Sequence, residues 1–92
     1  MKIGFFDSGI GGLAVLNRAL TILPNEDYIY YADVDHVPYG TKTKEQIIKF
    51  ADNAVQFLTA HDVKAIVVAC NTATSAAANY LRSQYDFPIL GM

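Results

Sequence analysis

The stretch Val67-Val68-Ala69-Cys70-Asn71-Thr72-Ala73 decides the fold of this chain, because an apolar run stops in it at the only cysteine and small polar residues follow at once. The run from Ala65 to Ala69 is typical of a strand that is buried on both faces of a parallel sheet. Asn71 or Thr72 can cap a helix that follows, which places the sulfur of Cys70 beside the positive end of a helix dipole. Such a position favours the thiolate over the thiol.

Outward from this stretch, strands alternate with helices. Apolar and aromatic runs predict strands within residues 3–6, 28–32, 64–70 and 87–90, and helical spacing predicts helices over residues 13–23, 44–60 and 74–84. The alternation predicts right-handed βαβ units and therefore a three-layer α/β fold around a parallel sheet, with the strand order 2-1-3-4. Ligands bind such sheets where the strand order reverses, between strands one and three, so Asp7 and Cys70 are expected to be neighbours there.

The same handedness rule predicts an incomplete structure. Right-handed crossovers put the first helix on one face of the sheet and the next two on the other, which leaves the first face poorly covered. The sequence also stops at Gly91-Met92, where the fourth strand ends. We therefore expect residues 1–92 to be a partial amino-terminal α/β domain of a longer protein.

Composition excludes several functional classes. The 92 residues carry a formal net charge of -2 with Lys and Arg scattered, so no basic patch is available for nucleic acid or for an anionic membrane. No run approaches the roughly 20 apolar residues of a membrane span. One cysteine cannot form an internal disulfide, which agrees with a reducing cytoplasm.

Cys70 has several possible interpretations. A single cysteine in an apolar strand is usually a small buried hydrophobic residue, but one at a strand tip before Asn-Thr stands where nucleophiles and bases are found. A cysteine phosphatase would need an arginine six residues further on, where this chain has Ala76. No metal site is predicted, because His36 and His61 lie in unrelated segments.

The glycine-rich turn after the first strand also allows alternatives. Gly9, Gly11 and Ala14 fit the dinucleotide-binding pattern, and Asp33 stands where an acid would bind a ribose. The carboxylate of Asp7 argues against that function, because it would repel a pyrophosphate at the helix N-terminus. A plain strand-to-helix turn is the other interpretation. A nucleotide-binding module and a non-catalytic small-ligand module both remain open.

The loop after the second strand contains Pro38-Tyr39-Gly40, which is ordinary turn chemistry. The loop nevertheless projects from the same edge of the predicted sheet as Asp7 and Cys70. Its backbone N–H groups could bind a carboxylate.

Four blocks of the sequence closely resemble, in order and spacing, the amino-terminal part of bacterial glutamate racemases. Aspartate racemases of the same superfamily share the Cys-Asn-Thr block, but the Asp-Ser-Gly-x-Gly-Gly and Pro-Tyr-Gly blocks favour glutamate racemase. The four blocks are Phe6–Leu13, Asp35 with Val37–Thr41, Val68–Ala73 and Pro88–Gly91.

The resemblance implies two α/β domains related by a pseudo-twofold axis, an active site between them and no cofactor. It implies that Cys70 is one of two catalytic thiols, acting on the D-glutamate face, and that Asp7 assists it. It also implies homodimers that supply D-glutamate for peptidoglycan in the cytoplasm. The residues that it implies in contact with glutamate are Asp7, Ser8, Tyr39, Gly40, Asn71 and Thr72.

One part of the family pattern is missing. The Gly-Cys-Thr-His block, which would carry the opposing cysteine, does not occur in these 92 residues. Racemisation without a cofactor needs one base on each face of the α-carbon. We therefore expect the isolated chain to be inactive although the protein it comes from racemises glutamate.

Overall fold

The computed structural model describes residues 1–9 and 11–92. Ile10, which belongs to the predicted turn after the first strand and to the Phe6–Leu13 block, lies outside the described residues. In chain order the elements are β1 (Lys2–Asp7), α1 (Leu13–Ile22), β2 (Asp27–Ala32), two 3₁₀ turns (Val34–His36 and Tyr39–Thr41), α2 (Lys44–Thr59), β3 (Val63–Val68), α3 (Asn71–Gln84) and β4 (Ile89–Gly91).

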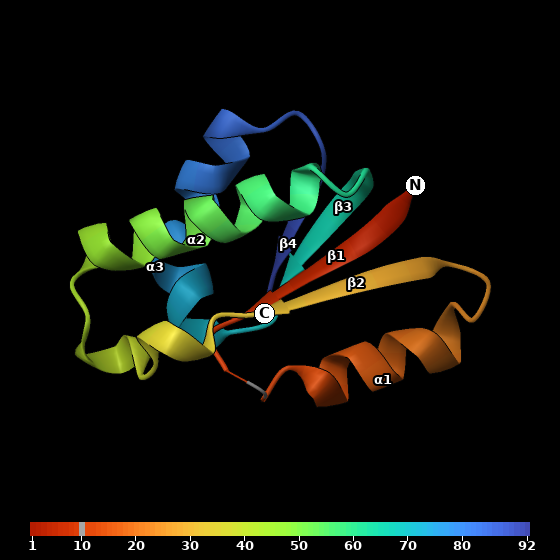
Figure 1. The fold of residues 1–92 in the computed structure, drawn as a ribbon, viewed down its shortest axis with the longest axis horizontal. Coiled ribbons are helices and arrows are strands. Elements are labelled where there is room, and N and C mark those ends of the chain that lie inside the picture. The colour runs from red at the N-terminus through yellow and green to blue at the C-terminus, as the bar shows by residue number, and fades with distance from the viewer. Residues whose placement is uncertain (10) are drawn as a thin grey trace.

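The described residues form one sheet of four parallel strands in the order β2-β1-β3-β4, which confirms the predicted topology (Figure 1). Phe6 of β1 is in register with Tyr31 of β2 on one side and with Val68 of β3 on the other. The central strands β1 and β3 are rich in apolar residues, as is usual for parallel strands that helices cover. Because β1 and β3 pair in parallel, their carboxyl ends lie side by side.

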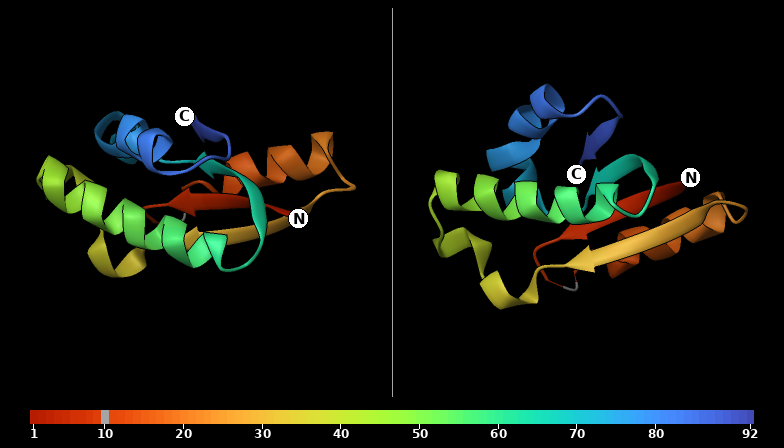
Figure 2. Two further views of the ribbon diagram at one scale, coloured as in Figure 1. Left: turned by 90° about the horizontal axis from the view of Figure 1, so that it is seen from above. Right: turned by 45° about the horizontal axis from the view of Figure 1, so that its top comes forward.

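The core lies between the sheet and the pair α2 and α3, which pack together over the same face (Figures 1 and 2). Small residues on both helices allow this close packing, since α2 buries Ala51 and Ala54 and α3 buries Ala77. The sheet contributes fully buried side chains such as Phe6, Ile66 and Val68. α2 begins at Lys44 because Thr43 and Gln46 form a capping box.

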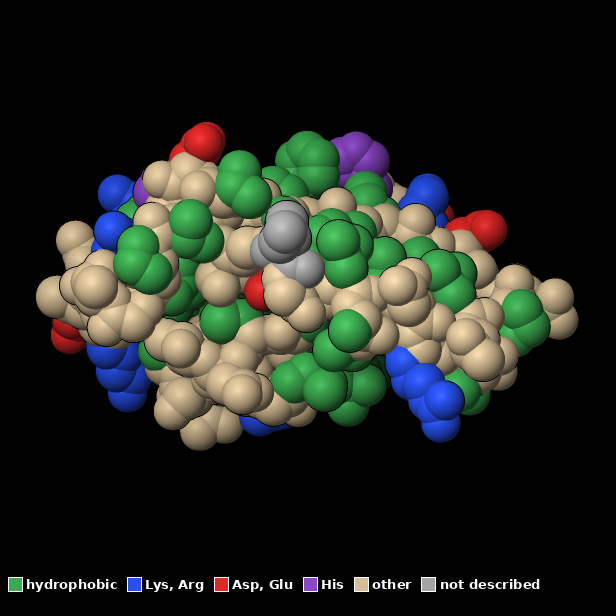
Figure 3. All heavy atoms as spheres, turned by 90° about the horizontal axis from the view of Figure 1, so that it is seen from below, with side chains coloured by type: hydrophobic (Ala, Val, Ile, Leu, Met, Phe, Trp, Pro, Cys, Tyr) green, Lys and Arg blue, Asp and Glu red, His purple; other side chains and the backbone are tan. Residues whose placement is uncertain are grey.

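The opposite face of the sheet carries α1, as the right-handed crossovers predict (Figure 1). α1, which the structure describes in full, has no buried residue. Tyr28 of β2 holds it by donating hydrogen bonds to the carbonyls of Ala19 (3.2 Å) and Leu23 (2.8 Å). Apolar side chains gather on this side of the molecule (Figure 3). Leu20 and Ile22 of α1 are exposed. The prediction of a poorly covered face is confirmed.

Element boundaries differ from the predicted ones mainly at α3. The sequence predicts that this helix starts near Thr74 with Asn71 or Thr72 as its cap, whereas α3 begins at Asn71 and Cys70 is the N-cap. The prediction was wrong because a thiol also accepts a hydrogen bond, so the sulfur of Cys70 receives the N–H of Ala73.

Candidate active site

The carboxyl ends of the three strands β2, β1 and β3 are tied together by backbone hydrogen bonds. The N–H of Asp33 donates to the carbonyl of Asp7 (2.9 Å), and the N–H of Ala69 donates to the carbonyl of Phe6 (2.8 Å). Asp7 therefore ends β1 and Cys70 follows the neighbouring strand β3, at the point where the strand order reverses, as predicted. This edge is the position at which open α/β sheets bind ligands.

Cys70 receives two hydrogen-bond donors at its sulfur. The hydroxyl of Ser8 lies 3.2 Å from Sγ and the N–H of Ala73 lies 3.5 Å from it. The residue is partly exposed, so it is not simply a buried hydrophobic residue. Donors to the sulfur, together with the start of α3, are the surroundings in which a thiolate acts as a base or nucleophile.

Asp7 is buried, with 3% of its surface exposed. Its Oδ2 accepts hydrogen bonds from the N–H of Gly12, the N-cap of α1, and from the hydroxyl of Tyr30 (2.9 Å). A Cβ on Gly12 would lie 2.7 Å from that oxygen and 2.8 Å from the Cβ of Ala69, so the close approach requires glycine. The N–H at the start of α1 thus binds a carboxylate of this chain, which argues against a pyrophosphate there.

The turn at Tyr39 and Gly40 is anchored by Asp33. The buried hydroxyl of Tyr39 donates to Oδ2 of Asp33 (2.5 Å), and Nδ1 of His36 lies 2.7 Å from Oδ1 of the same carboxylate. Burial first, and then Asp33, raise the pKa of Tyr39 far above its usual value. The ring of His36 stacks on Phe50 of α2 with 3.8 Å between ring centroids. Asp33 thus serves partners within the chain, while Gly40 is exposed.

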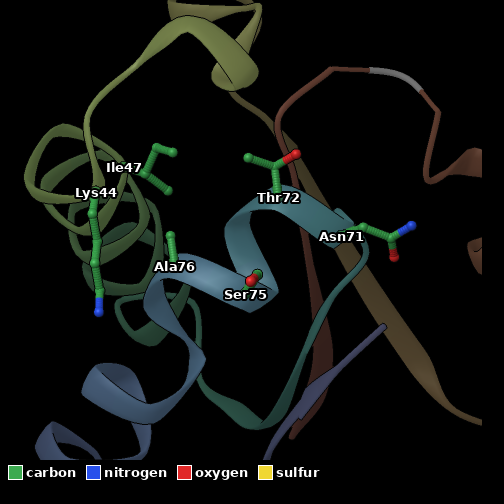
Figure 4. Close-up of a pocket in the computed structure, with 6 residues that line it drawn as sticks. All are labelled: Lys44, Ile47, Asn71, Thr72, Ser75 and Ala76. Atoms are coloured by element: carbon green, nitrogen blue, oxygen red, sulfur yellow. The ribbon is translucent and has the colours of Figure 1, made fainter.

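Asn71 and Thr72 are exposed on the first turn of α3. They border a hollow of about 670 Å³ between the N-terminal ends of α2 and α3 (Figure 4). Of the predicted site residues, Ser8 contacts the sulfur of Cys70, and Asn71 and Thr72 begin the helix that Cys70 caps. The phenol of Tyr39 faces Asp33 instead. The residues that line the hollow are Lys44, Ile47, Asn71, Thr72, Ser75 and Ala76.

Two partners in this region were not predicted from the sequence. Tyr30 bonds to Asp7, and Asp33 was considered only as a ribose ligand. The alternation of side chains along β2 could have indicated the contact of Tyr30 with Asp7. It places Tyr28 and Tyr30 on the same face of the sheet, and acidic residues stand at the strand ends. His36 is exposed, and its partner is the carboxylate of Asp33.

Residues 1–9 and 11–92 contain no group of three His, Cys, Asp or Glu side chains that could hold a metal ion. No described helix is long and apolar enough to cross a membrane.

The chain is similar over its whole length to the amino-terminal part of glutamate racemases. It is 62% identical over 92 residues to the glutamate racemase of Campylobacter curvus. This match covers all of this chain and 35% of that protein. The solved structure of the enzyme from Aquifex pyrophilus matches with a TM-score of 0.96 and 42% identity, over 99% of this chain and 36% of that one. No family model matches.

A third match contains a ligand. The glutamate racemase of Francisella tularensis, solved in complex with D-glutamate, matches with a TM-score of 0.92 and 44% identity, over 98% of this chain and 34% of that one. This chain therefore spans about a third of the length of the proteins that it matches.

Proposed function

We propose that this chain is the amino-terminal part of a glutamate racemase and supplies one of the two bases of its active site. The observation that carries the proposal is the 62% identity to a glutamate racemase over all 92 residues. The hydrogen bond from Ser8 to Cys70 at the carboxyl edge of the sheet supports a working site at that position. Binding of D-glutamate by the similar Francisella tularensis enzyme supports glutamate as the substrate.

In the proposed reaction, the thiolate of Cys70 takes the α-proton from D-glutamate, and a base from outside these residues returns a proton to the opposite face. The reverse reaction exchanges the two roles. Two bases are needed because one group cannot reach both faces of the α-carbon of a bound amino acid. The hydroxyl of Ser8 and the N–H of Ala73 both donate to the sulfur and hold the Cys70 side chain in place between turnovers.

The α-proton of an amino acid is weakly acidic, so the carbanion needs electrostatic stabilisation in a dry site. We propose that the side chains of Ser8, Asn71 and Thr72 and the backbone at Tyr39 and Gly40 bind the carboxylates of glutamate. Asp7, buried beside the tip of β3, would hold the substrate ammonium or pass a proton to the thiol. The reaction would use no cofactor.

The proposed biological role is the supply of D-glutamate for peptidoglycan, in the cytoplasm and as a homodimer. In the same proposal, residues 1–92 are a partial first domain, and the second catalytic domain comes from the rest of the protein. The chain's length, about 35% of the matched Campylobacter curvus protein, supports that division.

The proposal can be tested with a chimera in which residues 1–92 replace the matching segment of the Campylobacter curvus glutamate racemase. We expect the chimera to interconvert D- and L-glutamate, and Cys70→Ala to lower kcat by about 100-fold to 10,000-fold, the usual contribution of a positioned base. Chiral chromatography of the product measures both rates.

The matched control is Ser83→Ala, which removes a hydroxyl from the exposed C-terminal part of α3 without touching the sulfur contacts or the lining of the hollow. The control is expected to stay within about twofold of the chimera, well below the effect of a catalytic group. Normal turnover by the Cys70→Ala chimera would disprove the role of the thiol. A folded chimera without activity would disprove the assignment of the chain.

A further inference from the structure

Among the residues that the structure describes, Tyr30 is the one whose side chain donates a hydrogen bond to Asp7. It belongs to β2, where successive side chains point to opposite faces of the sheet. Tyr28 and Tyr30 point toward the face with α1, whereas Tyr31 packs against Phe57 of α2 with 5.2 Å between ring centroids. The strand thus contains three tyrosines with different partners, so a Tyr→Phe change at Tyr30 can be compared with the same change at Tyr28 and at Tyr31.

The hydroxyl of Tyr30 lies 2.9 Å from Oδ2 of Asp7 and 3.2 Å from the carbonyl oxygen of Gly9. A hydroxyl has one proton to donate, and the nearer, charged oxygen is the stronger acceptor. The same Oδ2 also accepts the N–H of Gly12. Two donors from different directions on one oxygen fix the rotation of the carboxylate about its Cβ–Cγ bond.

The protonation state of Tyr30 suits a permanent donor. Burial first, and then the hydrogen bond and charge of Asp7, raise the pKa of Tyr30 to about 12. The phenol therefore keeps its proton at every pH at which a racemase would be assayed. It can orient Asp7, but it cannot serve as a general base at neutral pH.

We propose that Tyr30 is a positioning residue for the racemisation reaction, which acts by holding the carboxylate of Asp7 in a fixed orientation toward the thiol side of the site. The inference rests on the proposed function, in which Asp7 assists Cys70. Within the described residues, Oδ1 of Asp7 accepts no hydrogen bond, so it is the oxygen left for substrate or thiol while Oδ2 is held.

The test uses the chimera with Tyr30→Phe, which removes the hydroxyl and keeps the ring. We expect kcat to fall about tenfold, which corresponds to the loss of one hydrogen bond to a charged group, while KM for D-glutamate stays within about twofold. Tyr28→Phe removes a hydroxyl that holds α1, and Tyr31→Phe alters the other face of β2. Both are expected to keep kcat.

A double variant shows whether Tyr30 acts through Asp7. In the Asp7→Asn background, Tyr30→Phe is expected to cause no further loss of kcat, because the carboxylate that it orients is already gone. In a second variant, 4-aminophenylalanine in place of Tyr30 keeps a donor at the ring and is expected to restore most of kcat. Circular dichroism melting of each variant reports whether it is folded.

Three results would overturn the inference. These are a normal kcat for Tyr30→Phe, a loss in the double variant that equals the product of the two single losses, or an equal loss in Tyr28→Phe. Failure of the proposed function is distinguishable, because it would appear as normal racemisation by the Cys70→Ala chimera whatever happens at Tyr30.

Discussion

At the scale of single residues, the contact between Gly12 and Asp7 sets the shape of the site. The backbone of Gly12 has φ -78°, which any residue can adopt, so glycine is needed for space and not for backbone conformation. The N–H of Gly12 holds the carboxylate in place, and Ala69 closes the other side of the gap. Because these groups come from β1, α1 and the end of β3, a change at Gly12 would disturb them together.

Gly12→Ala is therefore expected to displace Asp7 and to lower kcat of the chimera at least about tenfold, with a loss of about 1 to 3 kcal/mol in the free energy of unfolding of the 92-residue chain. The matched control is Gly11→Ala, because a Cβ on Gly11 would meet nothing within 4 Å. Racemisation assays and urea unfolding measure the two effects. If the two alanine variants behaved alike, the steric explanation would be wrong.

At the scale of elements, the helices α2 and α3 are joined by a polar contact as well as by their alanine packing. The hydroxyl of Tyr85, the C-cap of α3, donates to Oδ1 of Asp52 on α2 at 2.8 Å. Burial first, and then the hydrogen bond and charge of Asp52, raise the pKa of Tyr85 to about 12 from its ordinary value of 10.0. The folded protein therefore holds this proton more tightly than the unfolded chain does.

The raised pKa predicts a stability change at high pH. The contribution of Tyr85 is fully present below pH 10.0 and is lost as the pH rises toward 12, because the unfolded chain releases the proton first. Tyr85→Phe is expected to cost about 1 kcal/mol at neutral pH and to lose less stability between pH 10 and 12 than the unsubstituted chain. Urea unfolding at a series of pH values measures this difference.

The control for this series is Tyr80→Phe, because Tyr80 is an exposed tyrosine of the same helix. It is expected to follow the unsubstituted chain at every pH. A Tyr85→Phe chain as sensitive to alkali as that control would show that the contact with Asp52 does not couple the helices.

The elements were predictable because their causes are local. The apolar runs and helical spacing gave the parallel sheet and the order of the helices, and they brought Asp7 and Cys70 to one edge. The side-chain partners were harder to predict because they depend on register and rotamer. Tyr30 meets Asp7 only because β1 and β2 pair in register with Asp7 opposite Ala32, and Cys70 caps α3 only because its sulfur turns toward Ala73.

At the scale of the whole molecule, the two faces of the sheet differ. One face is covered by α2 and α3 and contains the core, while the other carries α1 (Figure 1). An apolar hollow of about 540 Å³ lies beside α1. The proposed site lies at the carboxyl edge of the sheet, with the hollow between α2 and α3 next to it. The chain contains one cysteine, and under the proposed function this residue supplies one base of the pair that inversion requires.

The most direct test of this account compares the isolated 92-residue chain with the chimera, each incubated with D-glutamate at the same protein concentration. Chiral chromatography measures the L-glutamate formed. The account predicts that the chimera brings the two enantiomers to equal amounts while the isolated chain forms no more L-glutamate than the Cys70→Ala chimera does. Interconversion by the isolated chain at the rate of the chimera would contradict the claim that these residues supply only one of the two bases.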